Sequence, residues 1–438
     1  MKKILTVITA VVSACCTVCL FSCGEKKPSA KIVPDGSLDK CTLRFSWWGG
    51  DDRHEATLNA IRLWNSIHPE IEVKAEYGGW DGWTEKVNAQ ISGGTEPDVM
   101  QINYDWLVSI SPDGKGFYDL YKIGDRLDLS GFDPETLSFG EVEGHLNAVT
   151  VSVSGRCLYY NSEVFRRLGA SYPDTWDSLL ELGRNFSSYG LYPLDLDIQS
   201  GGTAWYLSSV YVQQKTGRQF ITMDGKLGFT EQDIKSALDF YKMLEENHVI
   251  RTVKTRTDED GNCALYQSAE FIDGNIAGVL EWGSAVGKYE GVLDKGVLET
   301  GGLLSDGNGN STGWLVKPVL MYAVSANTSH PDEAGAFLDF LLNNAECAEI
   351  LGTTRGIPAS GYARESLEKT DGLSLLVQET DRLLRQADTM TVSPYAELPK
   401  VKAYCNTAIE NVSYNIEDTE TSAHELYESV KEYLEKFE

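Results

Sequence analysis

Tryptophan recurs beside glycine and hydrogen-bonding side chains in four short segments of the chain. The segments read WWGGDDR (47–53), GGWDGW (78–83), QINYDW (101–106) and EWGS (281–284). Indole rings can cover the apolar C–H faces of a pyranose, while carboxylates, amides and guanidinium groups bind the hydroxyl groups at its rim. The combination predicts a carbohydrate-binding site. Its candidate residues are Trp47, Trp48, Asp51, Arg53, Trp80, Asp81, Gln101, Asn103, Glu281 and Trp282.

Two further tryptophans, Trp205 and Trp314, flank glycine-rich segments and are also candidates for ligand contact. Each tryptophan could instead fill a hydrophobic core, because most aromatic side chains in any protein are buried. The core interpretation is favoured for Trp64, which lies inside a predicted helix, and for Trp176 in the segment Thr175-Trp176-Asp177.

The first candidate segments follow predicted strands. Residues 41–47 and 71–77 alternate between apolar and polar side chains, and 97–102 is a short apolar strand. Residues 54–68 and 83–92, which separate these strands, have helical spacing. Strand, helix, strand, helix and strand within about sixty residues predict a parallel, doubly wound α/β sheet. Ligands of such sheets bind beyond the carboxyl ends of the strands, which is where the tryptophans lie.

Length and charge limit the class of protein. The chain has 438 residues, of which 42% are hydrophobic, so two globular domains are expected rather than a disordered chain. Lys and Arg number 38 against 65 Asp and Glu, for a formal net charge of -27. A nucleic-acid binder needs cations that neutralise phosphates, so this charge excludes nucleic acid as a general partner.

The N-terminal residues have the pattern of an export signal. Lys2 and Lys3 precede a long apolar run, and Leu20-Phe21-Ser22-Cys23-Gly24 follows it. A basic start and the absence of a basic flank at the end are typical of a signal peptide rather than of a membrane-spanning helix. The residues around Cys23 resemble the lipobox of bacterial lipoproteins, although Phe21 is bulkier than the residue usual at its position.

The lipobox resemblance implies cleavage before Cys23 and attachment of diacylglycerol to its thiol. Residues 1–22 are then a signal peptide, and residues 23–40, which are polar and contain two prolines, are a lipidated cysteine and a flexible tether. The mature protein is expected outside the cytoplasm, held to a bacterial membrane by its lipid anchor. A plain secretory peptide and a membrane anchor are the alternatives.

Signatures of catalysis and of metal binding do not occur. The chain lacks GxSxG, HExxH and GxxxxGK[ST], so no catalytic residue is predicted. Residues 306–310 begin like a calcium loop, but Ser311 and Lys317 occupy positions that require glycine and an acid, so neither a metal nor a cofactor is expected. The cysteines beyond Cys23 are odd in number and lack metal-binding spacing, which predicts mostly unpaired, buried thiols. They are Cys41, Cys157, Cys263, Cys347 and Cys405.

Several motifs occur in a characteristic order. After the first tryptophan pair come SGGTEPDV (92–99), LYYNSEVF (158–165), PDTW (173–176), FIDGNIA (271–277) and residues 329–342. From about Thr42 to its end, the chain thereby resembles the family 1 extracellular solute-binding proteins of ATP-binding-cassette (ABC) importers, the maltose-binding group. RFSWWGGDDRH, EYGGWDGW and GGTEPDVMQINYDWL are most similar to its oligogalacturonide-binding branch, which takes up pectin fragments.

The resemblance implies a two-lobed periplasmic-binding-protein-like fold, with doubly wound sheets, a hinge and a central ligand cleft. The chain is expected to cross between the lobes near Ser154, Trp314 and Ser360. Ligand closes the lobes of the monomer by hinge rotation, and the membrane subunits of an ABC permease recognise the closed form. Such a protein binds its oligosaccharide without converting it. The expected lobe boundaries are 41–153 and 317–360 for lobe 1, and 154–316 and 361–438 for lobe 2.

A pectic ligand carries carboxylates and therefore requires cations. Arg53, Arg156 and Arg355 lie in loops of the matching kind, and guanidinium pairs with carboxylate through two parallel hydrogen bonds. Each arginine could equally form a surface ion pair. The alternative function is a secreted glycoside hydrolase or polysaccharide lyase, because acids such as Asp51 and Asp81 in a tryptophan-lined cleft would also suit catalysis. A lipid-anchored adhesin is a less favoured alternative.

Overall fold

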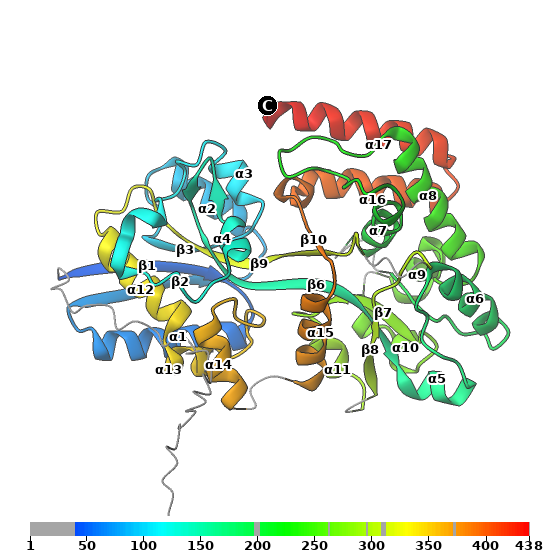
Figure 1. Ribbon diagram of the computed structural model, residues 1–438, viewed down its shortest axis with the longest axis horizontal. Helices are drawn as coiled ribbons and strands as arrows, with labels where there is room; N and C mark the ends of the chain where they lie inside the picture. Colours follow the sequence, from blue (N-terminus) through cyan, green and yellow to red (C-terminus); the bar gives the residue numbers. More distant parts are fainter. Residues whose placement is uncertain are drawn as a thin grey trace, which may run out of the picture.

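The computed structural model describes residues 40–196, 202–261, 263–294, 297–307, 312–370 and 374–437. Two α/β lobes are joined by two long strands, β6 (Val149–Asn161) and β9 (Leu315–Val324), which run from one lobe into the other (Figure 1). The predicted α/β class with two lobes is confirmed. The predicted signal peptide, lipid anchor at Cys23 and tether lie outside the described residues. No helix among the described residues is long and apolar enough to cross a membrane.

The first three predicted strands are confirmed in the lobe 1 sheet as β1 (Cys41–Trp48), β2 (Ile71–Gly78) and β3 (Val99–Ile102). They pair in parallel in the order β2-β1-β3. β9 and β6 then join in antiparallel pairing, so the sheet is mixed rather than wholly parallel. The difference arises because β9 returns from lobe 2 in the opposite direction, which no local pattern in the sequence records.

Helices on both faces of this sheet bury its alternating apolar side chains. Phe45 and Trp47 face α1 (Asp51–Ile67) and α12 (Pro331–Asn343), whereas α2 (Trp83–Ser92) covers the opposite face. These helices confirm the predictions for the corresponding segments. The other elements of lobe 1, with η denoting a 3₁₀ helix, are α3 (Trp106–Ile110), η1 (Leu120–Arg126), α4 (Pro134–Ser138), β4 (Glu141–Val142), β5 (His145–Leu146), α13 (Ala345–Leu351) and α14 (Gly361–Lys369).

Lobe 2 surrounds the second half of β6. There β6 pairs in antiparallel fashion with β7 (Gly278–Trp282) and β8 (Leu298–Gly302). Helices enclose these strands and share one large hydrophobic core. The further elements are α5 (Ser162–Leu168), α6 (Trp176–Ser187), α7 (Thr203–Thr216), α9 (Val253–Asp260), η2 (Leu265–Gln267), α10 (Ala269–Ile272), α11 (Gly287–Glu290), α15 (Leu375–Gln386), β10 (Met390–Thr391), η3 (Pro394–Glu397), α16 (Pro399–Ser413) and η4 (Glu435–Phe437).

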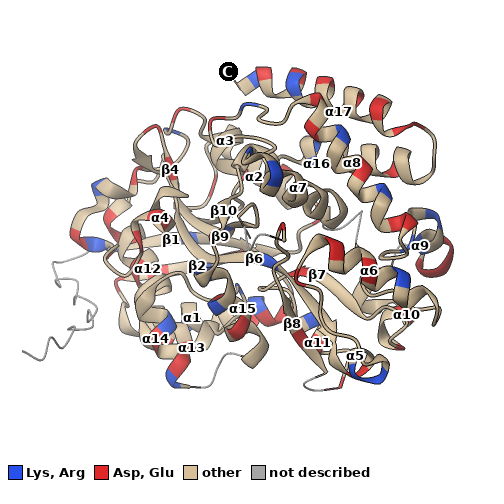
Figure 2. Ribbon diagram, turned by 45° about the vertical axis from the view of Figure 1, so that its right-hand side comes forward, with Lys and Arg blue, Asp and Glu red and all other residues tan. Residues whose placement is uncertain are grey.

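Two amphipathic helices on lobe 2 follow the patterns of their sequences. α8 (Glu231–Glu246) begins with the predicted capping box, in which the Thr230 and Asp233 side chains bond each other's backbone. α17 (Thr419–Leu434) buries Leu426 on its inner face. Acidic residues, red in Figure 2, recur along α9 and α17.

The joining strands change their pairing partners near Ser154. Residues 149–155 of β6 pair with β9 in the sheet of lobe 1, and from Arg156 onward β6 pairs with β7 in lobe 2. The predicted crossing point at Ser154 lies within this transition. Antiparallel pairing of β6 with β9 gives the hinge two adjacent strands instead of two independent loops.

The third crossing point needs a correction. α14 packs against α13 in lobe 1. The Tyr362 hydroxyl lies 2.9 Å from Ser130 Oγ, and the Gly361 N–H donates to the Gly131 carbonyl at 2.8 Å. The chain therefore leaves lobe 1 after α14 rather than near Ser360, because α14 buries its apolar face on lobe 1. The other lobe boundaries stay predictions.

Four cysteines of the described residues, Cys157, Cys263, Cys347 and Cys405, are free thiols. Cys157, Cys347 and Cys405 are buried, and burial raises the pKa of Cys157 and of Cys347 to about 12. Cys263 is exposed, and Cys41 is half-buried. The prediction of unpaired, mostly buried thiols is confirmed for these four residues.

Candidate functional site

A pocket opens in lobe 2 beside the strands that join the lobes. It holds about 720 Å³ of space between protein atoms, part of it open to solvent. Four aromatic side chains among the described residues line it, Trp205, Tyr206, Phe220 and Trp282, together with Leu315 of β9. The structure thus brings together two of the predicted site residues, Trp205 and Trp282.

Strand pairing and helix position fix these rings. Trp282 ends β7 directly opposite Arg156 on β6, so the two side chains are cross-strand neighbours. Trp205 and Tyr206 lie in the first turn of α7. The Tyr206 hydroxyl donates to the Leu315 carbonyl at 3.2 Å and accepts the Leu315 N–H at 3.1 Å. These two bonds attach α7 to β9 and hold the tyrosine ring at the pocket wall.

Arg156 lies between two of the rings. Its guanidinium carbon is 4.8 Å from the centre of the Tyr206 ring and 4.7 Å from the centre of the Trp282 ring. The side chain is only 3% exposed, yet it belongs to the pocket lining. Cations over aromatic faces are attracted to the ring electrons, most strongly where water is excluded. The rings therefore hold a guanidinium at the pocket in a defined orientation.

An ion cluster completes the pocket. Glu397 of η3 forms ion pairs with Lys317 of β9 and with Lys402 of α16, the latter at 2.8 Å. Burial alone would raise the pKa of the Glu397 carboxyl, but the two ammonium groups hold it well below its usual range. Lys317 also lies over Trp282, with its Nζ 4.8 Å from the ring centre. Glu397 is therefore ionised at neutral pH.

The pocket is positive although the protein is strongly negative. Arg156 and Lys402 are the cations among the described lining residues, and Glu397 is the carboxylate. Lys317 lies beside the pocket, where it pairs with Glu397. In Figure 2 a basic segment at β6 lies near the centre of the molecule. Charges close to a ligand in a partly desolvated site outweigh screened charges farther away. The local field therefore favours an anionic ligand.

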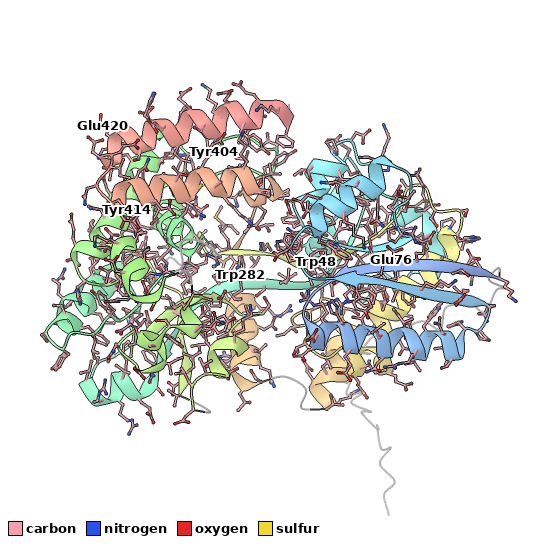
Figure 3. The ribbon with its side chains drawn as sticks, turned by 180° about the vertical axis from the view of Figure 1, so that it is seen from behind. Trp48, Glu76, Trp282, Tyr404, Tyr414 and Glu420 are labelled. Atoms are coloured by element: carbon pink, nitrogen blue, oxygen red, sulfur yellow. The ribbon has the colours of Figure 1, made fainter. Side chains whose placement is uncertain are left out.

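Lobe 1 presents its own group of rings. The ring centres of Trp48 and Trp80 are 5.1 Å apart, and those of Trp48 and Trp106 are 5.5 Å apart. Trp80 is 48% exposed, whereas Trp48 is 7% exposed. In Figure 3, Trp48 of lobe 1 and Trp282 of lobe 2 lie on the two sides of the junction between the lobes. Trp80 therefore offers an exposed indole on the lobe 1 side of this junction.

Charged groups of the two lobes approach each other near this groove. Burial raises the pKa of Asp105, at the start of α3, to about 6, and the charges of Lys402 and Glu397 on lobe 2 also act on it. Asn103 donates to the Asp105 carboxylate at 2.6 Å. The predicted residue Asn103 thus positions an acid that faces the ion cluster of the other lobe.

The predicted acids lie at more open positions. Asp51 begins α1 and Asp81 precedes α2, and both are exposed. Glu281 is half-buried, and its carboxylate accepts the N–H of Trp282 at 2.7 Å. These acids remain candidates for hydroxyl contacts, with Glu281 bound to the backbone beside the pocket.

Two predicted contacts are corrected by burial. Trp47 and Trp314 are 0% exposed, so neither ring is available to a ligand in this structure. Trp47 donates from Nε1 to His54 Nδ1 at 3.1 Å, and Trp314 stacks on Trp176. Successive residues of a strand point to opposite faces, so only one tryptophan of the pair 47–48 can face the groove side of the sheet. Trp64 and Trp176 are buried in cores as predicted.

The predicted ligand contacts Arg355 and Gln101 are also interior. Arg355 is 4% exposed and donates to Gln101 Oε1 at 2.9 Å and to Thr57 Oγ1 at 2.8 Å. Gln101 is fully buried and donates to the Trp48 carbonyl. Arg53 donates to the carbonyls of Trp48 and Thr354. The hydrogen bonds of these groups connect the end of β1 to the loop before α14, and they stabilise lobe 1.

Among the residues that sequence reasoning missed are four that belong to the pocket or to the ion cluster beside it. Tyr206, Lys317, Glu397 and Lys402 come from α7, β9, η3 and α16, which are distant in sequence. Lys317 lies next to the predicted crossing point at Trp314, and this was the available signal. Nothing local distinguishes Glu397 or Lys402 from the many exposed charges of the chain.

The sequence matches a known family over residues 51–346, the one described as bacterial extracellular solute-binding protein. The match covers more than half of the chain. This chain therefore belongs to the bacterial extracellular solute-binding proteins, which act outside the cytoplasm as the binding components of ABC transporters. The predicted family and the extracytoplasmic location are confirmed.

Two solved structures are similar over nearly their whole length. A periplasmic oligogalacturonide-binding protein from Yersinia enterocolitica, solved with saturated digalacturonic acid, is 33% identical, with a TM-score of 0.81; the alignment covers 90% of this chain and 99% of that one. A periplasmic solute-binding protein from Pectobacterium atrosepticum is 32% identical, with a TM-score of 0.84 and the same coverage.

Sequence relatives are more distant. The maltodextrin-binding protein MdxE of Bacillus subtilis is 21% identical, over 78% of this chain and 79% of its own length. A Brucella abortus protein named as a binding protein is 23% identical over 49% of this chain, and the chain spans about half of that relative, 54% of its length.

Proposed function

We propose that this protein captures short acidic oligosaccharides of the oligogalacturonide type in the groove between its lobes and delivers them to an ABC importer. The observation that carries the proposal is the lobe 2 pocket. Rings and a surplus of cations line it in a protein whose net charge is -27. The solved Yersinia protein, which binds digalacturonic acid, supports the proposal by its similarity across both lobes.

The proposed contacts divide by chemistry. Trp282 and Trp205 supply apolar surface for sugar faces, while Arg156 and Lys402 donate hydrogen bonds to the carboxylate of a uronic acid. Trp80 meets the ligand from lobe 1 because its ring is the exposed one of that group. A ligand that touches both lobes is bound more tightly by the closed form, and this difference in affinity drives closure.

Capture without chemical conversion agrees with the pocket. A glycosidase needs two carboxyl groups, one of them an acid with a raised pKa. Among the described lining residues the carboxylate is Glu397, whose pKa is lowered by Lys317 and Lys402. Asp105 on lobe 1 has a raised pKa and faces this cluster, so the preference for a binding protein over the alternative hydrolase or lyase is supported by the family rather than by the carboxyl groups.

Calorimetry tests the proposal directly. The purified protein is titrated with digalacturonate, with its methyl ester and with maltotriose, and each mixture is then analysed for products by chromatography. We expect saturable binding of digalacturonate, weaker binding of the neutral ester, and no products. Equal affinity for ester and acid would remove the uronate preference, and product formation would remove the binding-protein assignment.

Membrane attachment through Cys23 is part of the proposal. Replacement Cys23→Ser removes the thiol that carries the lipid, so the protein should move from the membrane fraction to the soluble extracytoplasmic fraction. Retention of this variant in the membrane fraction contradicts lipid anchoring at Cys23.

A further inference from the structure

Cys41, His330 and Glu333 come together at the end of lobe 1 that is remote from the groove. β1 starts at Cys41 and ends at Trp48, whose ring contacts Trp80 on the groove side, so Cys41 is at the far end of the strand. His330 is the residue before α12, and Glu333 lies in the first turn of that helix. The first residue of a central strand and the start of a helix thus bring together a thiol, an imidazole and a carboxylate.

The spacing of the three groups suits one small cation. One sulfur, nitrogen or oxygen atom from each residue lies within 4.8 Å of the others, and His330 Nδ1 is 3.9 Å from Glu333 Oε2. Zinc bond lengths with tetrahedral angles place neighbouring ligand atoms about 3.4–3.6 Å apart. The three groups therefore need shifts of roughly 1 Å or less on each side chain, which rotation about the side-chain bonds of Cys41, His330 and Glu333 can supply.

The kinds of ligand select the cation. Thiolate and imidazole are soft or intermediate ligands, which favour Zn²⁺, whereas Ca²⁺ and Mg²⁺ prefer oxygen ligands only. We propose that Cys41, His330 and Glu333 bind one Zn²⁺ in lobe 1, with water in the fourth position. Burial of the Glu333 side chain, which is 9% exposed, strengthens its attraction to a dication.

The ligands are carried by backbone that is already ordered. The Cys41 N–H donates to the Glu70 carbonyl at 3.1 Å, and Cys41 pairs with Ile71 in the β1–β2 ladder. The Ala334 N–H donates to the His330 carbonyl at 2.9 Å and starts α12. A site carried by a strand and a helix needs little ordering on binding, so less of the binding free energy is lost to entropy.

The consequence for the protein is a metal-mediated link between strand β1 and helix α12. β1 lies between β2 and β3 in the sheet, and a metal would tie its first residue to α12. Because the metal binds the folded lobe, it stabilises that lobe against unfolding. Sugar binding is expected to be unaffected, since the three residues lie at the end of lobe 1 remote from the groove. The outcome at this site is therefore independent of the proposed ligand.

Metal titration tests the site. The purified protein is freed of metal with a chelating resin and titrated with Zn²⁺ against a chromophoric chelator. We expect one tight equivalent and a higher thermal midpoint with Zn²⁺ than without. With Co²⁺ in place of Zn²⁺, we expect a thiolate charge-transfer band and the intense visible bands of tetrahedral cobalt, which report coordination by sulfur.

Three variants and a matched control assign the ligands. Cys41→Ser, His330→Gln and Glu333→Gln should each weaken Zn²⁺ binding by at least about tenfold. Even residues that only support a metal ligand typically cost this much when they are replaced. Cys263→Ser removes the exposed thiol and should leave binding unchanged. Circular dichroism verifies that each variant is folded. If Cys41→Ser does not fold, the cobalt spectrum of the wild type tests coordination by the thiolate, and the other two variants test the remaining ligands.

Specific outcomes overturn the site. They are the absence of a tight equivalent in the wild type, a cobalt spectrum without the thiolate band, or equal affinity in the wild type and in the ligand variants. Loss of binding in Cys263→Ser would assign the metal to another thiol and would equally reject the proposal. Several weak equivalents that persist in all variants would identify adventitious surface binding.

Discussion

Each lobe buries a cluster of cations, and the two clusters have different partners. In lobe 2, Lys317 and Lys402 share the carboxylate of Glu397 beside a pocket lined by rings. In lobe 1, Arg355 donates to the neutral oxygens of Gln101 and Thr57 inside the lobe. Both clusters are positive, but the first borders the ring-lined pocket of about 720 Å³, whereas Arg355 borders a smaller cavity of about 400 Å³ that contains no aromatic side chain among its described lining residues.

The difference shows that a buried cation is not by itself a ligand contact. Burial lowers the pKa of Arg355, and its hydrogen bonds go to groups that hold the loop before α14. Arg156 is equally buried, yet two rings direct its guanidinium to the pocket lining. We therefore expect lobe 2 to determine the preference for charge, and lobe 1 to supply apolar surface from Trp80.

The largest expected effect is on stability in lobe 2. Glu397→Gln leaves Lys317, whose side chain is 16% exposed, without its anion, and breaking a buried pair costs about 3–5 kcal/mol in the free energy of unfolding. We expect the lower end of this range, because Lys402 is 48% exposed and its part of the cluster is screened by water. Urea denaturation at neutral pH measures this loss. A variant as stable as the wild type would show that the cluster is solvated and is not comparable with a buried pair.

The same variant has a defined pH dependence. The pKa of Glu397 is lower in the folded state than in the unfolded chain, so its contribution to stability is complete above the ordinary glutamate pKa and is lost as the pH falls below it. The stability difference between wild type and Glu397→Gln should therefore narrow progressively on acidification. A difference that stays constant with pH would contradict an ionised Glu397.

Ligand affinity should depend next on Trp282. Replacement Trp282→Ala removes a ring of the pocket wall that also contacts the guanidinium of Arg156. We expect digalacturonate to bind about 2–4 kcal/mol more weakly, roughly 30- to 700-fold. Calorimetry measures the affinity. Trp64→Phe is the control, because Trp64 lies in the core of lobe 1 and its change should alter stability with little effect on affinity. Equal loss of affinity in both variants would indicate a general defect of folding.

Loss of a pocket cation should have a smaller effect, and that effect should be selective for charged ligands. Lys402→Met should weaken binding of digalacturonate by about 1.5–2 kcal/mol, since a charge-assisted hydrogen bond is lost, and should leave maltotriose binding unchanged. Lys254→Met makes the same change in net charge at an exposed position on α9. A similar loss with Lys254→Met would assign the effect to the field of the whole protein.

The smallest effect on ligand preference should come from lobe 1. Arg355→Met removes the donors to Gln101 and Thr57, which should lower stability by about 1–3 kcal/mol. The ratio of affinities for digalacturonate and maltotriose should stay the same as in the wild type. A selective loss of acidic ligand would place Arg355 in the site and would remove the contrast between the two clusters.

Periodicity predicted the front of the fold well. Alternation identified β1 and β2, helical spacing identified α1 and α2, and the order of motifs identified the family. The same pattern did not record that β9 runs antiparallel to β3, or that α14 belongs to lobe 1. Strand direction and helix docking depend on contacts between residues that are far apart in the sequence.

The candidate site residues show the same dependence on distant contacts. Trp47 and Trp48 are adjacent and identical in type, but the pleat sends Trp47 into the core and Trp48 toward Trp80. Residue type therefore indicated the chemistry without the face on which each side chain lies. Glu397 carried no local signal, since its role comes from lysines on two other elements.

The amino-acid sequence by itself determined the class of fold, the solute-binding family and the supply of rings and charges, because these depend on local periodicity and motif order. Only the tertiary structure decided which rings and cations are grouped beside the groove, because β6, β7, β9, α7 and α16 meet there from distant parts of the chain. Side-chain burial follows from how strands and helices pack, and that packing is a property of the whole fold.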